Sequence, residues 1–522
     1  MLKESLLLNK DISGGSWIQR NFNSTVLLGL VLLLGTTLRL YDLGAESYWI
    51  DEMSTVIEGQ QTIKQLFTSG RLDQPPAYYL PFHLWMQLFS ATEISTRLFS
   101  AMIGIGSIVL IYLIGLNLFS KEVGLISAFL MSISEFQIYY SQVARFYSFF
   151  EFTTLLSFLF FILALRRKTI LQFTLYTLAS IIMVYSHTYG MFILAAQGIF
   201  FILHVKKYKN LIAIWLMCQG LIVLALLPYF YPLIFGAGGG VGGAIDLNIG
   251  GLPAPSPLDP FRSIYRFIMS ARRDRNWEIM FANYAIAGIL LVAGTWIYSA
   301  RSGMGTLLDE ARSQFNLQKL SKLKSKCILL SFWLLCPIIF PFILSFVVGP
   351  MYQDHYMISA APALYLLMSL GIFSVRKLVP TIISLSVLMV IILPGLGYYY
   401  ATDIHEQWKE VALHVDENSG PNDVIVVAPN QGIGIEQKTF DWYYEGSLNS
   451  YGFGSDFIDS ATLSEALIKA VSGYDRVWVV MRDDPNESYY RTFFLDTEQI
   501  GMNLIEEHHF FEISAYLFEI PE

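Results

Sequence analysis

The sequence predicts a polytopic α-helical membrane protein that ends in a small soluble α/β domain. Hydrophobic residues make up 54% of the 522 residues and charged residues only 15%, which is too apolar for an ordinary soluble enzyme of this length. After residue 400, in contrast, 23 acidic side chains stand against 6 basic ones. We therefore expect two domains, residues 1–400 in the membrane and residues 401–522 in water.

The membrane domain is expected to contain about eleven spans, since a spanning helix needs about 20 mostly apolar residues. The apolar stretches lie near residues 24–41, 98–119, 123–140, 146–165, 170–187, 189–205, 211–233, 281–300, 327–348, 356–374 and 378–397. The first lacks a small-residue cleavage site and is followed by further spans, so we interpret it as a retained helix. The three cysteines fall inside apolar stretches, which predicts neither a disulfide framework nor a CxxC metal site.

The orientation follows from the positive-inside rule, which counts Lys and Arg in short loops. With a cytoplasmic N-terminus, every short loop on that side is basic. These residues are Lys3, Lys10, Arg20, Lys121, 166–168, 206–209, the cluster 301–326, and 376–377. The opposite side holds the long connections 42–97 and 234–280 and, after an odd number of spans, the C-terminal domain. We therefore expect an inner-membrane protein whose C-terminal domain is extracytoplasmic.

The C-terminal domain alternates helical and strand patterns. Amphipathic segments predict helices at 404–418 and 460–472, and Val/Ile-rich segments predict strands at Asp423–Ala428, Arg476–Met481 and near 510–520. Its acidity argues against a nucleic-acid partner. We interpret it as a solubilising lid or a partner-docking module, with a second catalytic site as the alternative.

Two adjacent carboxylates, Asp51 and Glu52, follow the first span directly after the interfacial Trp49. Charged side chains at a membrane boundary are costly unless they face water or a cavity, so their clustering indicates function. The alternative is an aromatic belt followed by a solvated helix 52–69 that Ser47 or Asp51 caps. The polar groups expected on the same face favour a functional site.

Some of these groups lie in the first outer loop and the next turn on that face. A second surface helix is expected over 77–90, with Tyr78 and His83, and the two surface helices would roof a cavity. Arg145 lies at the outer boundary, against the positive-inside bias. It either reaches lipid phosphate or, beside Tyr147, binds a phosphate-bearing substrate, because guanidinium binds phosphate oxygens in a bidentate fork.

Two histidines are expected at the same depth, His187 and His355, the latter followed by Tyr356. A histidine at a helix end is either a hydrogen-bonded boundary residue or a ligand. With Asp51 and Glu52 on the same face as His187, a divalent metal stays an open alternative, and the sequence identifies no definite cofactor.

The loop 234–280 has two unlike halves. Gly236–Gly243 contains a formal GxGxxG match, but it follows a membrane span and no βαβ strand, so we expect a mobile flap and no nucleotide site. The second half is rich in arginine, which indicates either attraction to anionic headgroups or a second phosphate contact. Its arginines are Arg262, Arg266, Arg272, Arg273 and Arg275.

Taken in order, these motifs resemble bacterial members of the type C (GT-C) glycosyltransferase superfamily. The resemblance is to the group 39 transferases, which include protein O-mannosyltransferases, the lipid A aminoarabinose transferase and lipopolysaccharide-core galacturonosyltransferases. It spans roughly residues 25–400. The motifs are Trp49-Ile50-Asp51-Glu52, Pro75-Pro76-Ala77-Tyr78-Tyr79 through His83-Leu84-Trp85, Arg97-Leu98-Phe99-Ser100-Ala101, and Tyr140 through Tyr147.

The resemblance implies transfer of a sugar from a polyprenyl-phosphate donor to a glycan, glycolipid or protein acceptor on the outer face. Asp51 matches the family's catalytic acidic residue, and Glu52 would orient the acceptor or a metal. The chemistry also fits the residues, since a carboxylate can remove the acceptor proton while cations stabilise the leaving phosphate. The donor-phosphate group comprises Arg145, Tyr147, Arg262, Arg266, His355 and Tyr356, and the acceptor cavity comprises Trp49, Tyr78, His83 and His187.

The sequence departs from the family at one loop, where His355-Tyr356 with Pro362 replaces the usual Arg-Tyr pair followed by prolines. Two other classes are the alternatives. A secondary transporter would usually show broken helices in two repeats with ionisable groups near mid-membrane, and no such repeat is visible. A non-catalytic cell-envelope assembly protein would use the acidic tail for docking.

Overall fold

The computed structural model describes residues 24–68, 76–235, 254–268, 317–374, 378–428, 434–453, 467–483, 497 and 500–521. The chain forms two compact units. The first contains residues up to Tyr41, Thr62–Trp85 and Leu98–Tyr398, and the second contains Asp42–Gln61, Met86–Arg97 and Tyr399–Glu522. The residues after 400 thus form one unit with two segments of the first outer loop. A single boundary at residue 400 stays a prediction.

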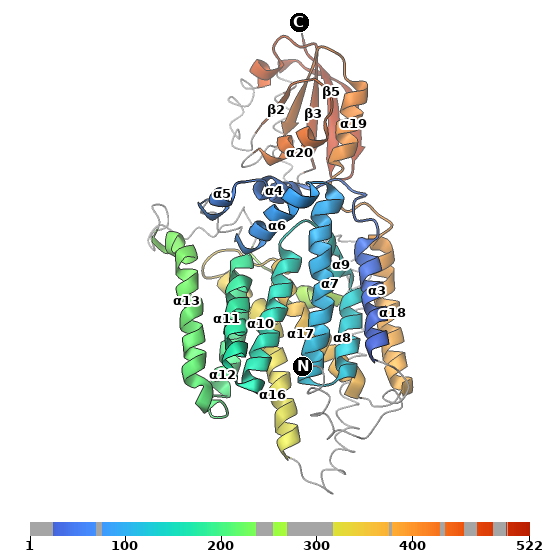
Figure 1. Ribbon diagram of the computed structural model, residues 1–522. Helices are drawn as coiled ribbons and strands as arrows, with labels where there is room; N and C mark the ends of the chain where they lie inside the picture. The colour runs from blue at the N-terminus through green and yellow to red at the C-terminus, as the bar shows by residue number, and fades with distance from the viewer. Residues whose placement is uncertain are drawn as a thin grey trace. The chain divides into compact units, whose positions relative to one another are not determined.

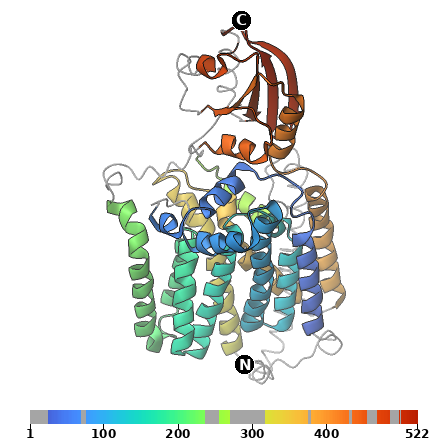
Figure 2. The same cartoon turned by 45° about the horizontal axis from the view of Figure 1, so that its top comes forward.

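The first unit is helical, and its long helices run alongside one another as a bundle (Figure 1 and Figure 2). In chain order they are α3 (Ser24–Leu40), α5 (Ile63–Thr68), α6 (Pro76–Phe89), α7 (Glu93–Leu118), α8 (Lys121–Ile133), α9 (Glu135–Gln142), α10 (Tyr147–Arg167), α11 (Ile170–Ser186), α12 (Gly190–Leu203), η1 (Lys209–Leu211), α13 (Ile212–Phe235), α14 (Asp259–Ile268), α16 (Leu317–Leu344), η3 (Asp354–Ala360), α17 (Ala361–Ser374) and α18 (Leu378–Tyr399). Helix α6 ends and α7 begins in segments of the second unit.

The predicted polytopic membrane architecture is confirmed. Among the described residues, six helices are long and apolar enough to cross a membrane, and α8 with α9, bent by 60°, makes a seventh candidate. Helices α3, α11 and α12 are apolar but shorter. Every expected span in the described residues coincides with one of these elements, and the segment 281–300 lies outside them.

The surface of the first unit exposes large apolar side chains, which are stable only in contact with a nonpolar environment. Leu221 and Leu224 on α13 and Ile383 and Val390 on α18 are all exposed. Inside the bundle, the rings of Phe158 and the buried Trp333 stack with centroids 3.8 Å apart. This distribution is the one expected of helices that face lipid.

The first outer loop corrects one expectation. The helix expected over 52–69 is two helices, α4 (Ile50–Gly59) and α5, while the expected helix 77–90 is α6. The interruption has a local cause at Thr62, whose backbone N–H donates to Gln65 Oε1 at 2.9 Å and whose hydroxyl donates to the same oxygen at 2.7 Å. These bonds start a new helix after Gln61.

The second unit is built on a five-stranded sheet in the order β2-β1-β3-β5-β4, which confirms a small C-terminal α/β domain. Strands β1, β2 and β3 are parallel, and β5 is antiparallel to both β3 and β4. The bounds are α19 (Trp408–Asn418), β1 (Asp423–Ala428), α20 (Ile435–Tyr443), β2 (Ser450–Gly452), β3 (Arg476–Arg482), β4 (Asn503–Phe510) and β5 (Ile513–Glu519). In Figure 1, helix α19 runs alongside the strands and α20 lies at their lower end.

Alternation along the strands explains the two cores of this domain. Ile425 and Trp478 pack with Trp408 of α19 on one face, while Val424 and Val477 pack with other apolar side chains on the opposite face. Strands β1, β3 and β5 and helix α19 were predicted, whereas α20, β2 and β4 were not. The helix expected over 460–472 falls partly outside the described residues.

Candidate active site

The two carboxylates of the first outer loop lie in the first turn of α4, where acidic side chains favour the helix dipole. Their surroundings differ. Asp51 is partly exposed, whereas Glu52 is completely buried. Of the two adjacent residues, only Asp51 can therefore contact a substrate that enters from solution.

Glu52 forms a bidentate ion pair with Arg97 of α7. The Arg97 Nη2 lies 2.6 Å from Glu52 Oε2, and Nε lies 2.9 Å from Oε1. The same guanidinium donates to the carbonyls of Leu43, Glu46 and Ser47 at 2.9–3.3 Å. A buried pair with all donors used fixes the loop and the start of α4 in one geometry.

The start of helix α4 is hydrogen-bonded to a carboxylate that lies far away in the sequence. Its N-cap residue is Trp49, so neither Ser47 nor Asp51 is the cap, which corrects that expectation. Glu406 Oε2 accepts the backbone N–H of Ile50 at 3.0 Å, and the Ser47 hydroxyl donates to the Glu406 carbonyl at 2.8 Å. One N–H group of the first turn, that of Ile50, thus has a carboxylate as its acceptor.

Glu406 is itself held in place from two further directions. Trp408 Nε1 donates to its Oε2 at 2.7 Å, and Arg482 Nη1 lies 3.4 Å from its Oε1. Burial raises the pKa of the Glu406 carboxyl, and Arg482 opposes that effect. The carboxylate therefore balances the cost of desolvation against its hydrogen bonds.

Further residues after 400 contact the same loop. The carboxylate of Glu46 lies 2.5 Å from His405 Nδ1, and the rings of Trp49 and His405 stack at 5.9 Å. The backbone N–H of Tyr48 donates to the Tyr443 hydroxyl at 2.7 Å. The C-terminal segment thus helps to build the carboxylate site, a role that no motif indicates because the partners are more than 350 residues apart.

The first unit holds a second cluster around Arg145, which follows α9 and is buried. Its guanidinium carbon lies 5.0 Å from the ring centre of Phe146 and 5.7 Å from that of Tyr147. Cation–π contacts and burial strengthen the field of this cation toward an anion. Arg145 is therefore a buried charge beside the aromatic rings and not a side chain extended to lipid.

Two further loops meet this cluster, and they carry the two histidines that the sequence expects at the same depth. The His355 ring lies 5.2 Å from that of Tyr147 and 4.3 Å from that of Tyr356. The His187 ring lies 4.6 Å from that of Tyr356 and 5.2 Å from that of Phe146. His187 Nδ1 accepts the Tyr189 N–H at 3.1 Å, which leaves Nε2 as the protonated nitrogen of the neutral ring.

Helix α6 borders this cluster. The buried Tyr78 ring lies 6.4 Å from that of Phe146 and 5.2 Å from that of Phe82. His83, one turn further along α6, is partly exposed. The helix thus adds an aromatic layer next to the Arg145 loop.

The two described arginines of the loop 234–280 differ in their partners. Arg262 is half exposed and pairs with Asp259 at 2.9 Å within α14. Arg266 is largely buried and forms an ion pair with Asp354, which also accepts the Ser263 hydroxyl at 2.6 Å. This network ties α14 to the loop that carries His355. The glycine-rich flap and Arg272, Arg273 and Arg275 lie outside the described residues.

The proposed metal ligands are divided between the units. Asp51 and Glu52 belong to the second unit and His187 to the first, and both oxygens of Glu52 are engaged by Arg97. A metal at the carboxylate site therefore stays a prediction that depends on Asp51.

The chain matches a protein family over part of its length. The family described as dolichyl-phosphate-mannose-protein mannosyltransferase matches residues 73–231, which include Tyr78, Arg145 and His187. A protein of Aquifex aeolicus (strain VF5), described as uncharacterized, is 28% identical over 215 residues, 39% of this chain. The match spans 42% of that relative's length.

Solved structures share the fold over nearly the whole chain. ArnT from Cupriavidus metallidurans in the apo state has a TM-score of 0.55 at 12% identity, covering 94% of this chain and 98% of ArnT. ArnT bound to undecaprenyl phosphate gives 0.54 at 12% identity, covering 95% and 98%. The oligosaccharyltransferase AglB from Archaeoglobus fulgidus, in complex with an inhibitory peptide and a dolichol-phosphate, gives 0.50 at 13% identity, covering 96% and 74%.

The partial family match and the shared fold together confirm the resemblance to GT-C glycosyltransferases that the motifs indicated. The fold of this chain, a helical membrane part and a small C-terminal sheet domain, is similar to that of ArnT.

Proposed function

We propose that this protein transfers a sugar from a polyprenyl-phosphate donor to an acceptor hydroxyl, with Asp51 as the general base. The observation that carries the proposal is the difference in burial between the two adjacent carboxylates. Glu52 is buried against Arg97, whereas Asp51 is partly exposed. Asp51 lies at the start of helix α4, which is held by the Glu52–Arg97 pair and by the carboxylate of Glu406. A positioned carboxylate suits proton removal in a displacement reaction.

The reaction balances with groups that the chain supplies. As the acceptor oxygen attacks the anomeric carbon, its proton passes to the Asp51 carboxylate. The bond from the anomeric carbon to the phosphate oxygen breaks, and its electron pair leaves on the polyprenyl phosphate. Arg145 stabilises that negative charge, since it is a buried cation beside aromatic rings.

Other side chains receive supporting roles in this proposal. Glu52 is a positioning residue that acts through Arg97. Tyr147, His355 and Tyr356 bind the donor phosphate around Arg145, because their rings surround the same cluster. The acceptor side is assigned to Trp49, Tyr78, His83 and His187.

The arginines of α14 are assigned different roles. Arg266 positions the His355 loop through its pair with Asp354. Arg262 is half exposed and attracts the donor or lipid headgroups from the surface.

The relatives support a lipid-phosphate donor. ArnT was solved with undecaprenyl phosphate and AglB with dolichol-phosphate and a peptide. A donor already activated by phosphate and anchored by its prenyl tail suits an enzyme embedded in the bilayer. The acceptor is proposed as a glycan, glycolipid or protein.

Orientation completes the proposal. The basic short loops support a cytoplasmic N-terminus and a C-terminal domain outside an inner cell membrane. Fusion of alkaline phosphatase after residue 522 should give an active reporter, since that enzyme needs an oxidising compartment. An inactive fusion with normal expression would show that the C-terminal domain lies on the cytoplasmic side.

Activity can be tested without knowing the acceptor. Purified full-length protein in liposomes is given a panel of polyprenyl-phosphate sugars, and release of polyprenyl phosphate is measured with cell-envelope extract as acceptor. In parallel, mass spectrometry compares envelope glycans with and without the gene. Release of the lipid phosphate and loss of one glycan are expected. An unchanged glycan profile, with vesicles that take up solute instead, would favour a transporter.

A further inference from the structure

Strand β4 is at one edge of the sheet and carries four consecutive polar residues, Glu506 to His509. Side chains alternate between the faces of a strand. Glu506 and His508 stand opposite Leu517 and Ala515, which pack in the core beside α19. Glu507 and His509 point to the other face.

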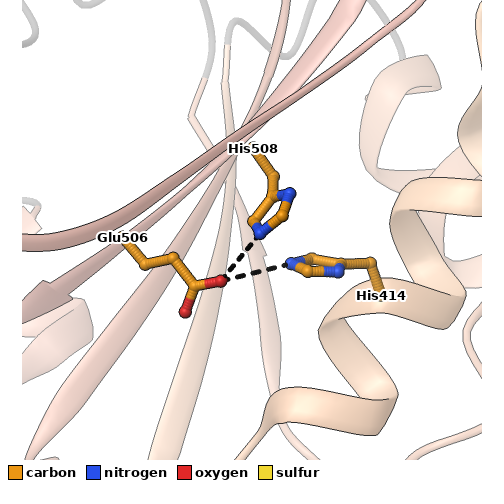
Figure 3. A group of neighbouring side chains, drawn as sticks. All are labelled: His414, Glu506 and His508. Carbon is orange, nitrogen blue, oxygen red and sulfur yellow. Dashed lines mark ion pairs between the residues drawn. The ribbon is translucent and has the colours of Figure 1, made fainter.

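On the face of α19, the two side chains of β4 meet His414 (Figure 3). His508 Nε2 lies 2.8 Å and His414 Nε2 lies 3.9 Å from the same Glu506 oxygen, Oε1. All three ligand atoms lie within 4.8 Å of one another. Among the described residues, this is the group of three His, Cys, Asp or Glu side chains that satisfies such spacing.

The surroundings of His414 suit a metal ligand. Its Nε2 atom is buried and has no hydrogen-bond partner among the described residues, although it points at the carboxylate. Burial, together with the neighbouring His508, lowers the pKa of the His414 imidazole.

We propose that His414, Glu506 and His508 bind a divalent transition-metal cation, with Zn²⁺ as the occupant. Two imidazoles and a carboxylate are the ligand set of many zinc sites that keep a water in the fourth position. Ligand atoms of a tetrahedral zinc ion lie about 3.3 Å apart. The observed separations of 2.8 and 3.9 Å bracket that value, so small side-chain shifts would admit the ion.

An ordinary surface ion pair is the simpler alternative. It accounts for Glu506 and His508, but it leaves the buried His414 nitrogen directed at the same oxygen unexplained. The other ring nitrogen, Nδ1, lies 3.4 Å from Asn418 Nδ2. The same Nδ2 atom donates to the His414 carbonyl at 2.8 Å, so the Asn418 amide contacts both the ring and the main chain of His414.

Occupation would have a structural consequence. The ion would fasten the edge strand β4 to α19, which starts two residues after Glu406. Edge strands are the least supported members of a sheet. Zn²⁺ would therefore stabilise the C-terminal domain.

The test uses the purified full-length chain, treated with a chelator and then titrated with ZnCl₂. Calorimetry measures binding, and Co²⁺ substitution reports tetrahedral geometry by its visible absorption. We expect one equivalent of Zn²⁺ and a raised melting temperature. His508→Ala and Glu506→Gln should each weaken binding at least about tenfold.

The chain offers a matched control in His509→Ala, which removes the neighbouring histidine from the opposite face of the same strand. It should bind Zn²⁺ like the wild type, and so should Asp51→Asn, which separates this site from any metal at the proposed active site. Equal zinc binding in His508→Ala, Glu506→Gln and His509→Ala, or none by the wild type, would overturn the proposal, whatever the outcome for sugar transfer.

Discussion

The carboxylate of Glu406 accepts a hydrogen bond from the backbone N–H of Ile50, a residue 356 positions earlier in the chain. Ile50 opens the helix that carries Asp51 in its first turn. The C-terminal domain therefore supplies part of the support for the proposed base, in addition to any role in solubility or docking.

This support predicts that Glu406→Ala lowers both stability and transfer. Loss of a helix cap costs about 1–2 kcal/mol, and Arg482 and Ile50 lose their acceptor as well. Thermal unfolding of the purified chain and the transfer assay measure the two effects. Glu445→Ala, which removes an exposed carboxylate from the same unit, should change neither. A fully active Glu406→Ala protein would show that α4 needs no such support.

The raised pKa of Glu406 predicts a pH dependence of stability. Because the folded state holds the proton more tightly than the unfolded state, the contribution of this group is fully present below the unfolded pKa, about 4.3. It is lost as pH rises through the folded pKa. The melting temperature of the wild type minus that of Glu406→Gln should therefore fall as pH rises from about 4. A difference that grows with pH would contradict this assignment.

Removal of one partner from the buried pair Glu52–Arg97 is expected to lower the stability of the protein strongly. Glu52→Ala leaves an unpaired buried guanidinium, which costs about 3–5 kcal/mol. A double substitution with Arg97→Met should recover part of that loss. The half-exposed Arg262 gives the comparison, since Arg262→Ala, which removes its pair with Asp259, should cost at most about 1 kcal/mol. Equal losses at both sites would mean that Glu52 has no special positioning role.

Arg145 should govern the use of the donor. Arg145→Ala is expected to raise the KM for the lipid-linked sugar and lower kcat, because the cation binds phosphate in the ground state and in the transition state. Arg145→Lys should be intermediate, since it keeps the charge without the fork. Arg262→Ala should have a smaller effect, as Arg262 is half exposed and paired with Asp259. Unchanged kinetics in Arg145→Ala would exclude it from the donor site.

Much of the fold can be predicted from the sequence because membrane helices are recognisable as long stretches of apolar residues. The expected spans in the described residues all correspond to helices. The break between α4 and α5 was missed because it depends on side-chain bonds of Thr62 and Gln65. Strand β4 was missed since Glu506 to His509 look like a solvated segment, and their pairing with β5 comes from tertiary structure.

The candidate site was predictable in part for the same reason. His187 and His355 were expected at one depth with Arg145, and their rings do meet around Phe146, Tyr147 and Tyr356. Contacts that join residues more than 350 positions apart leave no periodic or motif signal. The roles of Glu406, His405 and Tyr443 therefore became visible only in the structure.

The most direct test of the central claim is the rate of sugar transfer by Asp51→Asn, which removes the base while keeping the size of the side chain. Loss of a general base predicts a rate at least about 100-fold lower with unchanged expression and melting temperature. The control is Asp42→Asn, the same chemical change at an exposed position of the same loop, and it should keep full activity. Full transfer activity in Asp51→Asn would contradict the account.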